Sequence, residues 1–192
     1  VTMGCKNLER HIENIGKFGV PVIVAINDYV TDAEKEHTAI INYCKNIGVQ
    51  CKISSHWEKG GEGAADLAEE VAKIADSNSA EFKTLYDNKM SLWDKTQCIA
   101  QNIYGAADII ADKKLRNQFK KLEDDGFGEY PICMAKTQYS FSTDPLLMGA
   151  PSGHDVPIRE VRLAAGAEFL VVVCDKIMTM PGLPRVPAAN SI

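Results

Sequence analysis

Residues 21–32, PVIVAINDYVTD, decide the fold of this chain. The first half is a short unbroken apolar run rich in β-branched residues, which indicates a strand covered on both faces, as in a parallel sheet. The run turns polar at Asn27 and Asp28 and restarts as a helix, with Thr31 and Glu34 at the spacing of a capping box. Strand, polar turn and capped helix is the arrangement beside which open α/β sheets bind ligands.

The segments on either side repeat this alternation of helix and strand. Residues 7–18 form an amphipathic pattern before the strand, and residues 32–47 continue as a helix after it. Residues 49–53 then alternate apolar and polar side chains, which predicts a second, half-buried strand. Because crossover connections are right-handed, the two strands should be parallel neighbours that end at the same edge of one sheet.

One aromatic residue follows each of these strands. Tyr29 lies in the turn after the first strand, and Trp57 lies in SSHWEKGGEG, residues 54–63, after the second. Two rings at one sheet edge form a slot that holds a flat heterocycle by stacking and apolar contact. The alternative is that each ring packs against its own loop. Asn27 and Asp28 lack the Asn-x-x-Asp spacing with which P-loop GTPases bind the guanine base. Capping of the turn by their side chains is therefore the simpler role.

The remaining chain predicts an α/β fold with mostly parallel sheet units, flanking helices and a second, smaller α/β part toward the C-terminus. The expected domains are residues 1–78, which carry the slot, and residues 79–192. Helices are expected at residues 64–75, 81–104 and 112–125, strands at 108–110, 131–135, 158–163 and 169–174, and irregular chain at 137–157 and 178–187. Long irregular segments in compact domains are usually functional or partly disordered.

Composition excludes several classes of function. The 192 residues carry a net charge of -5 without a basic stripe, which argues against nucleic-acid binding. No apolar run reaches the roughly 20 residues needed to span a bilayer, and the first residues do not form a secretory signal. The sequence contains no G-x-x-x-x-G-K-[ST] motif, so it has no phosphate loop of its own. It also opens inside a helical pattern and ends abruptly, which suggests an incomplete chain.

The cysteines and histidines give no sign of a metal site. Six cysteines are scattered without a C-x-x-C pair, which favours a reducing compartment and buried thiols, and hence a cytoplasmic protein. The four histidines are dispersed as well, so no metal site is predicted.

No catalytic triad is suggested by spacing. Gly60, Gly61 and Gly63 either cradle an anion at a helix start or only permit a tight turn, and Lys136, Arg159 and Arg162 are candidate anion partners.

Ordered blocks along the whole chain resemble the formate–tetrahydrofolate ligase family, also called formyltetrahydrofolate synthetase. The blocks are NLERHIEN at 7–14, KFGVPVIVAIN at 17–27, WEKGGEG at 57–63, PICMAKTQYSFS at 131–142, IREVRLAAGA at 158–167 and MTMPGLPRVPAA at 178–189. The resemblance covers about the last third of such an enzyme, and the family's N-terminal phosphate-loop domain is absent. It implies a ligase of one-carbon metabolism that phosphorylates formate with ATP and passes the formyl group to N10 of tetrahydrofolate.

The resemblance also implies which residues bind substrates. An aromatic residue after A-I-N and the tryptophan of W-x-x-G-G-x-G stack on the pterin, which assigns Tyr29 and Trp57, with Asn27 and Asp28 beside them, to tetrahydrofolate. Tyr29 stands where the family often has phenylalanine, and its hydroxyl leaves the stacking face intact. The stretch GAPSGHDVPIR resembles one near the nucleotide, which assigns Ser152, Gly153 and Pro157 to ATP binding. His154 followed by Asp155, and Glu168, depart from the family pattern.

The resemblance places ATP, magnesium and formyl phosphate mostly on the missing domain of the same enzyme. We therefore expect no catalytic residue, no tightly bound cofactor and no activity in this chain alone, and a homo-oligomer for the full-length protein.

Two other functions remain open. The chain is either a non-catalytic piece for structural support and oligomerisation, or a base-reading module of a P-loop NTPase, in which case nucleotide binding would not depend on Trp57.

Overall fold

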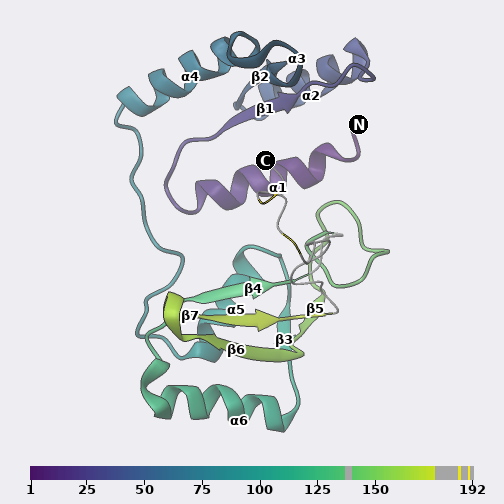
Figure 1. Ribbon diagram of the computed structural model, residues 1–192. Helices are drawn as coiled ribbons and strands as arrows, with labels where there is room; N and C mark the ends of the chain where they lie inside the picture. Colours follow the sequence, from purple (N-terminus) through teal and green to yellow (C-terminus); the bar gives the residue numbers. More distant parts are fainter. Residues whose placement is uncertain (137–139, 176–185, 187–189, 191–192) are drawn as a thin grey trace. The chain divides into compact units, whose positions relative to one another are not determined.

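The computed structural model describes residues 1–136, 140–175, 186 and 190 (Figure 1). The chain divides into two compact units, Val1–Asp87 with Gly149–Pro151 and Asn88–Met148 with Ser152–Ile192. Each unit combines helices with small, mostly parallel sheets, which confirms the predicted α/β class. Residues 137–139 of the expected irregular segment, and nearly all of the proline-rich segment 178–189, lie outside the described residues.

The first unit is built around two parallel strands. Its elements in order are α1 Cys5–Gly16, β1 Ile23–Asn27, α2 Glu34–Asn46, β2 Gln50–Ser54, α3 His56–Lys59, a 3-10 turn Gly60–Ala64 and α4 Ala65–Asp76. β1 and β2 pair in parallel from Ile23 opposite Gln50 to Asn27 opposite Ser54. The amide of Asp28 donates to the Ser54 carbonyl oxygen at 3.0 Å and extends the ladder by one residue. The predicted parallel pair is therefore confirmed.

The prediction that β1 is covered on both faces is wrong. Val24 and Ile26 are buried, whereas Ala25 and Asn27 between them are exposed. The sheet of this unit has only two strands, and among the described residues its helices bury only alternate side chains of β1. An unbroken apolar run marks a strand but does not reveal how many of its faces are covered.

The helix after β1 begins later than the capping-box spacing predicts. α2 starts at Glu34 with Ala33 at the N-cap position, and the Glu36 carboxylate accepts from the Ala33 amide at 3.0 Å. The preceding residues form a turn in which the Asp32 amide donates to the Tyr29 carbonyl oxygen at 2.9 Å. Because this turn occupies the chain through Asp32, the capping role falls to Glu36 rather than to Thr31 and Glu34.

The helix predicted for residues 81–104 is also shorter than expected. Within these residues the α-helix is α5, Leu92–Asn102, which the Ser91 hydroxyl caps by accepting from the Asp94 amide at 3.0 Å. The backbone upstream bonds elsewhere, since the Glu81 amide donates to the Gly19 carbonyl oxygen at 2.8 Å and the Lys83 amide to that of Phe18 at 3.0 Å. These long-range bonds replace the bonds that a helix would have formed.

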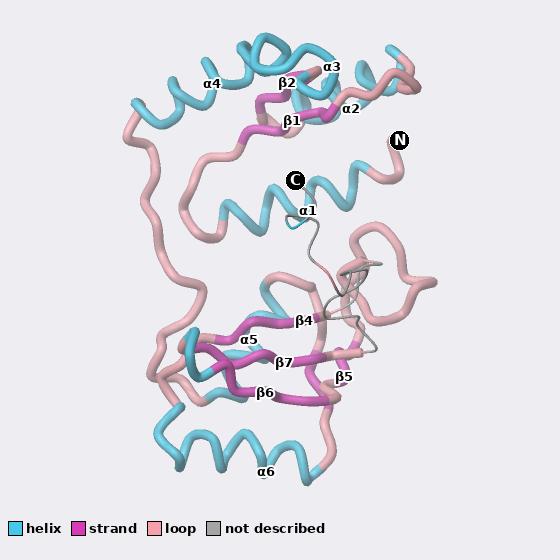
Figure 2. The backbone as a smooth tube through the Cα atoms, in the orientation of Figure 1, coloured by secondary structure: helices cyan, strands magenta, loops and turns pink. Residues whose placement is uncertain are grey.

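The second unit packs helices against short strands, and Figure 2 shows the distribution of both. Its elements after α5 are β3 Asp108–Ile110, α6 Lys113–Leu122, a π-helical turn Glu123–Phe127, β4 Ile132–Ala135, β5 Asp155–Pro157, β6 Glu160–Ala164, a 3-10 turn Ala165–Ala167 and β7 Phe169–Val173. β3 pairs with β5 and β4 with β7 in parallel, while β6 runs antiparallel to β7.

The core of this unit is apolar, and a buried cation lies against it. Leu92, Ile109 and Leu170 are fully buried in it. The side chain of Lys95 is also fully buried, and its ammonium donates to the carbonyl oxygens of Gly128 at 2.7 Å and Tyr130 at 3.1 Å. These bonds offset part of the cost of burying its charge. None of the helices among the described residues has the length and apolarity that a bilayer crossing demands.

We predict that Gly19→Ala destabilises the first unit by about 2 kcal/mol, because Gly19 combines a positive φ of 71° with a close backbone approach. A Cβ at this position would lie 2.0 Å from the Glu81 carbonyl oxygen. Gly16→Ala is the matched control, since a Cβ there meets nothing within 4 Å. Urea unfolding followed by circular dichroism measures both variants, and equal midpoints would contradict the prediction.

Candidate functional site

The structure brings Tyr29 and Trp57 together at the carboxyl ends of β1 and β2. Tyr29 follows β1 by two residues, and Trp57 lies in the short helix α3 directly after β2. Their ring centroids are 6.1 Å apart and their planes are tilted by 50°. Both rings are open to solvent, with 47% of Tyr29 and 62% of Trp57 exposed. The two predicted rings are therefore neighbours, and neither is sealed in its own loop.

The rings contact one another rather than flanking an open gap. A flat ligand between two parallel rings needs about 7 Å, twice a carbon–carbon contact of about 3.5 Å. The observed tilt and separation leave no such space, so a heterocycle enters between the rings only if one of them rotates. Exposed side chains change rotamer within nanoseconds, which makes this rotation fast. The outer faces of both rings are available for stacking without any movement.

Tyr29 is held at both ends by neighbouring side chains. The Asp32 carboxylate accepts from the Tyr29 amide at 3.0 Å, and the Asn27 side-chain amide donates to the Tyr29 hydroxyl at 3.1 Å. Asn27 therefore contacts Tyr29 directly. The Asp28 carboxylate lies instead 3.3 Å from the imidazole Nε2 of His37.

Trp57 is positioned by a close backbone approach. The Ser55 amide donates to the Gly63 carbonyl oxygen at 3.0 Å, which folds the 3-10 turn back over the start of α3. A Cβ on Gly63 would lie 2.5 Å from the Ser55 carbonyl oxygen, so this position requires glycine. Gly60 has a positive φ of 61°, a backbone conformation that glycine adopts freely. Turn geometry alone accounts for both residues.

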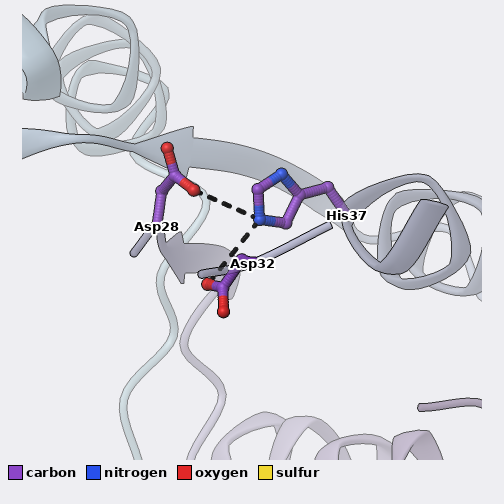
Figure 3. Close-up of side chains that lie close together, drawn as sticks. All are labelled: Asp28, Asp32 and His37. Carbon is purple, nitrogen blue, oxygen red and sulfur yellow. Dashed lines mark ion pairs between the residues drawn. The ribbon is translucent and has the colours of Figure 1, made fainter. Parts of the chain in front are cut away.

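Sequence reasoning missed one cluster beside the rings. Asp28, Asp32 and His37 each offer a ligand atom, and these atoms lie within 4.8 Å of one another (Figure 3). Nε2 of His37 is 3.3 Å from the Asp28 carboxylate and 3.8 Å from that of Asp32. The three residues are four and five positions apart in the sequence, from the loop after β1 to the first turn of α2. This spacing matches neither a helix period nor a strand period, so the sequence gave no sign of the cluster.

The residues assigned to the nucleotide belong to the second unit. Ser152, Gly153 and Pro157 are exposed. The Gly153 amide donates to the Gly105 carbonyl oxygen at 2.8 Å, and Pro157 pairs with Ile110 at the end of β5. These contacts place Gly153 beside the turn between α5 and β3, and Pro157 at the end of the β3–β5 pair.

Two of the candidate anion partners, the buried Lys136 and the exposed Arg162, already bond to other groups of the protein. The Lys136 ammonium is buried, donates to the Ser142 carbonyl oxygen at 3.2 Å and lies 5.6 Å from the centre of the Tyr104 ring. Burial lowers the pKa of Lys136. The Arg162 guanidinium donates to both carboxylate oxygens of Glu160, at 2.6 and 2.8 Å. An anion would have to displace these partners.

Comparison with known proteins identifies relatives along the entire chain. A family model described as formate–tetrahydrofolate ligase matches residues 1–192. The formate–tetrahydrofolate ligase of Roseobacter denitrificans is 58% identical over 192 residues and that of Granulibacter bethesdensis is 57% identical, each covering 100% of this chain. That of Pelagibacter ubique is 55% identical over 98% of the chain. The chain spans about a third of the length of these relatives, 34% in each case.

We predict that Trp57→Ala lowers the free energy of unfolding by less than about 1 kcal/mol, because an exposed ring contributes little to folding. The matched control is Trp93→Ala. Trp93 packs edge-on against Phe119 at 5.5 Å and lies under the Arg116 guanidinium at 4.3 Å. Its truncation should cost about 3 kcal/mol. Urea denaturation measures both, and a larger loss for Trp57 than for Trp93 would show that Trp57 is a structural residue.

Proposed function

The chain belongs to the formate–tetrahydrofolate ligase family, and we propose that it supplies the tetrahydrofolate-binding part of such an enzyme. In the proposed reaction, a formate oxygen attacks the γ-phosphorus of ATP and ADP leaves. N10 of tetrahydrofolate then attacks the carbonyl carbon of formyl phosphate, and phosphate departs as 10-formyltetrahydrofolate forms. Phosphorylation is needed because the oxygen of formate is a poor leaving group until it carries a phosphoryl group.

The aromatic pair is the observation that carries this proposal. Tyr29 and Trp57 present solvent-exposed ring faces at the carboxyl edge of two parallel strands, the place where α/β sheets bind ligands. A pterin is a flat heterocycle, and stacking on aromatic faces is the contact that suits it. Asn27 supports the Tyr29 hydroxyl and has carbonyl and amide groups that match the polar edge of a pterin. Asp28 lies next to this pair and completes the proposed set.

The chemistry of phosphoryl transfer is proposed to reside largely outside this chain. The sequence has no phosphate loop, so its nucleotide contacts are limited to the exposed group Ser152, Gly153 and Pro157. Magnesium prefers near-octahedral oxygen ligands, and the Asp28, Asp32 and His37 cluster includes an imidazole nitrogen, which does not fit that preference. We assign no step to a metal in this chain. We further propose a cytoplasmic enzyme that acts as a homo-oligomer.

A folate analogue should bind the chain through the aromatic pair. We predict that Trp57→Ala weakens binding at least about tenfold, because a stacked ring contributes about 1–3 kcal/mol where a base stacks on an aromatic side chain. Trp57→Phe should retain most of the affinity, since it keeps an aromatic face. Isothermal titration calorimetry gives the dissociation constants.

The control for this experiment is another exposed aromatic residue of the same unit. Phe82 is 70% exposed and is not part of the Tyr29–Trp57 contact. Phe82→Ala should leave the affinity for the folate analogue within about twofold, because it removes no stacking partner of the ligand. If Phe82→Ala and Trp57→Ala weakened binding equally, the assignment of the aromatic pair to the pterin would be wrong.

The chain alone should form no 10-formyltetrahydrofolate. We predict no turnover above background when it is supplied with ATP, magnesium, formate and tetrahydrofolate, because nothing in its sequence matches a phosphate loop. Absorbance of the folate product after acid conversion measures the reaction. Appreciable turnover would contradict the view that the phosphoryl-transfer residues lie elsewhere in the enzyme.

A further inference from the structure

The geometry points to a divalent transition-metal site formed by Asp28, Asp32 and His37. The site lies beyond the proposed folate function and does not depend on it. Asp28 and Asp32 lie in the loop between β1 and α2, His37 lies in the first turn of α2, and the three side chains point toward one another (Figure 3). The ligands are one imidazole nitrogen and two carboxylate oxygens.

The separations between the ligand atoms match those around a bound metal. Zinc binds nitrogen and carboxylate oxygen at about 2.0–2.2 Å, which places two ligands of a tetrahedral site about 3.4 Å apart. His37 Nε2 lies 3.3 Å from the Asp28 oxygen and 3.8 Å from the Asp32 oxygen. Both His37 separations are within a few tenths of an ångström of that spacing, and the two carboxylate oxygens lie within 4.8 Å of each other.

The distances fit a direct ion pair less well. A charge-assisted hydrogen bond from an imidazolium to a carboxylate is about 2.7–2.9 Å long. Both His37 separations exceed this, and Nε2 of His37 is buried without a hydrogen-bond partner. The imidazole is largely enclosed, with 13% of its side chain exposed. A buried, unpartnered nitrogen aimed at two carboxylates is the arrangement that a cation completes.

The local charge and the backbone also favour a cation. Residues 28–37 contain four carboxylates and one lysine, so the potential around the cluster is negative. The Asp32 carboxylate already accepts from the Tyr29 amide at 3.0 Å, which fixes its orientation. Such outer-shell hydrogen bonds hold metal ligands in place. The ladder bond from the Asp28 amide to Ser54 fixes the backbone of Asp28 in the same way.

The ligand set selects a class of metal. Imidazole suits zinc and other transition metals, carboxylates suit harder cations, and the mixture favours Zn²⁺ or Mn²⁺ over Mg²⁺. Three protein ligands leave a fourth position of a tetrahedral site for water. A bound ion would link the end of β1 to the start of α2 across the turn that carries Tyr29.

The test uses the chelator-treated 192-residue chain and Zn²⁺ at neutral pH. Calorimetry should detect a site that His37→Gln weakens at least about tenfold, because loss even of an outer-shell partner costs about 10–100-fold in affinity. Asp28→Asn should have a similar effect. His11→Gln is the matched control, an exposed histidine on α1, and should change the affinity less than about twofold. Excess Mg²⁺ should not displace Zn²⁺.

Long-range proton–nitrogen spectra of the imidazoles identify the ligand directly. On adding Zn²⁺, the Nε2 resonance of His37 should shift while that of His11 stays in place. Zinc affinity unchanged by His37→Gln would assign the ion to other groups, such as the exposed Cys133 thiol, and would overturn the proposal. A His37 resonance that does not respond to Zn²⁺ would overturn it too. If circular dichroism shows that His37→Gln does not fold, the proposal is tested by the zinc affinity of Asp28→Asn and by the imidazole spectra of the unsubstituted chain.

Discussion

The parallel pairing of β1 with β2 is the constraint on which the candidate site depends. The ladder runs to Asn27 opposite Ser54, so both strands end at the same level and their next residues leave from one edge. Tyr29 and Trp57, 28 residues apart in sequence, meet there for that reason. A register slip of one residue would send the strand side chains to the opposite face and separate the two loops. The ladder bond from Asp28 to Ser54 opposes such a slip.

Asp32 links two features of this edge. One oxygen of its carboxylate accepts from the Tyr29 amide and also faces His37 Nε2. The turn that orients the tyrosine ring therefore shares a side chain with the carboxylate and imidazole cluster. A carboxylate oxygen has lone pairs for both partners, so the two roles do not compete. Any change at this side chain acts on the turn and on the cluster together.

Much of the fold follows from local sequence patterns. Apolar periodicity located α1, α2, α4 and every strand except β5 to within a few residues, and the parallel pairing of β1 with β2 followed from their order. β5, Asp155–Pro157, lies in a segment that was predicted to be irregular, because three residues are too few to show a period. The predictions failed where contacts with a distant part of the backbone determine the local structure. Glu81 and Lys83 bond to the loop at Phe18 and Gly19, more than 60 residues away, and no local pattern reveals this. The exposed side chains of β1 likewise depend on which elements surround the strand.

The candidate site divides in the same way. Strand order predicted that the two rings share an edge, but their tilt depends on side-chain rotamers and on the Asn27 hydrogen bond. The cluster went unnoticed because two of its members lie in the irregular loop between β1 and α2 and the third lies in the first turn of α2. The sequence suggested turn capping for Asp28 and a helix start at Asp32, and it gave His37 no ligand role. Only the path of the turn brings their oxygens to the imidazole.

Exposure alone does not mark the aromatic pair as functional. Phe82, in the same unit, is more exposed than either ring, and single exposed apolar residues are ordinary on protein surfaces. The pair differs because its rings touch each other, stand at the carboxyl ends of parallel strands, and are oriented by polar neighbours. Two solvent-exposed rings held against each other contribute little to the stability of the fold. A flat ligand would gain two stacking faces, and this is why we propose ligand binding as the role of the pair.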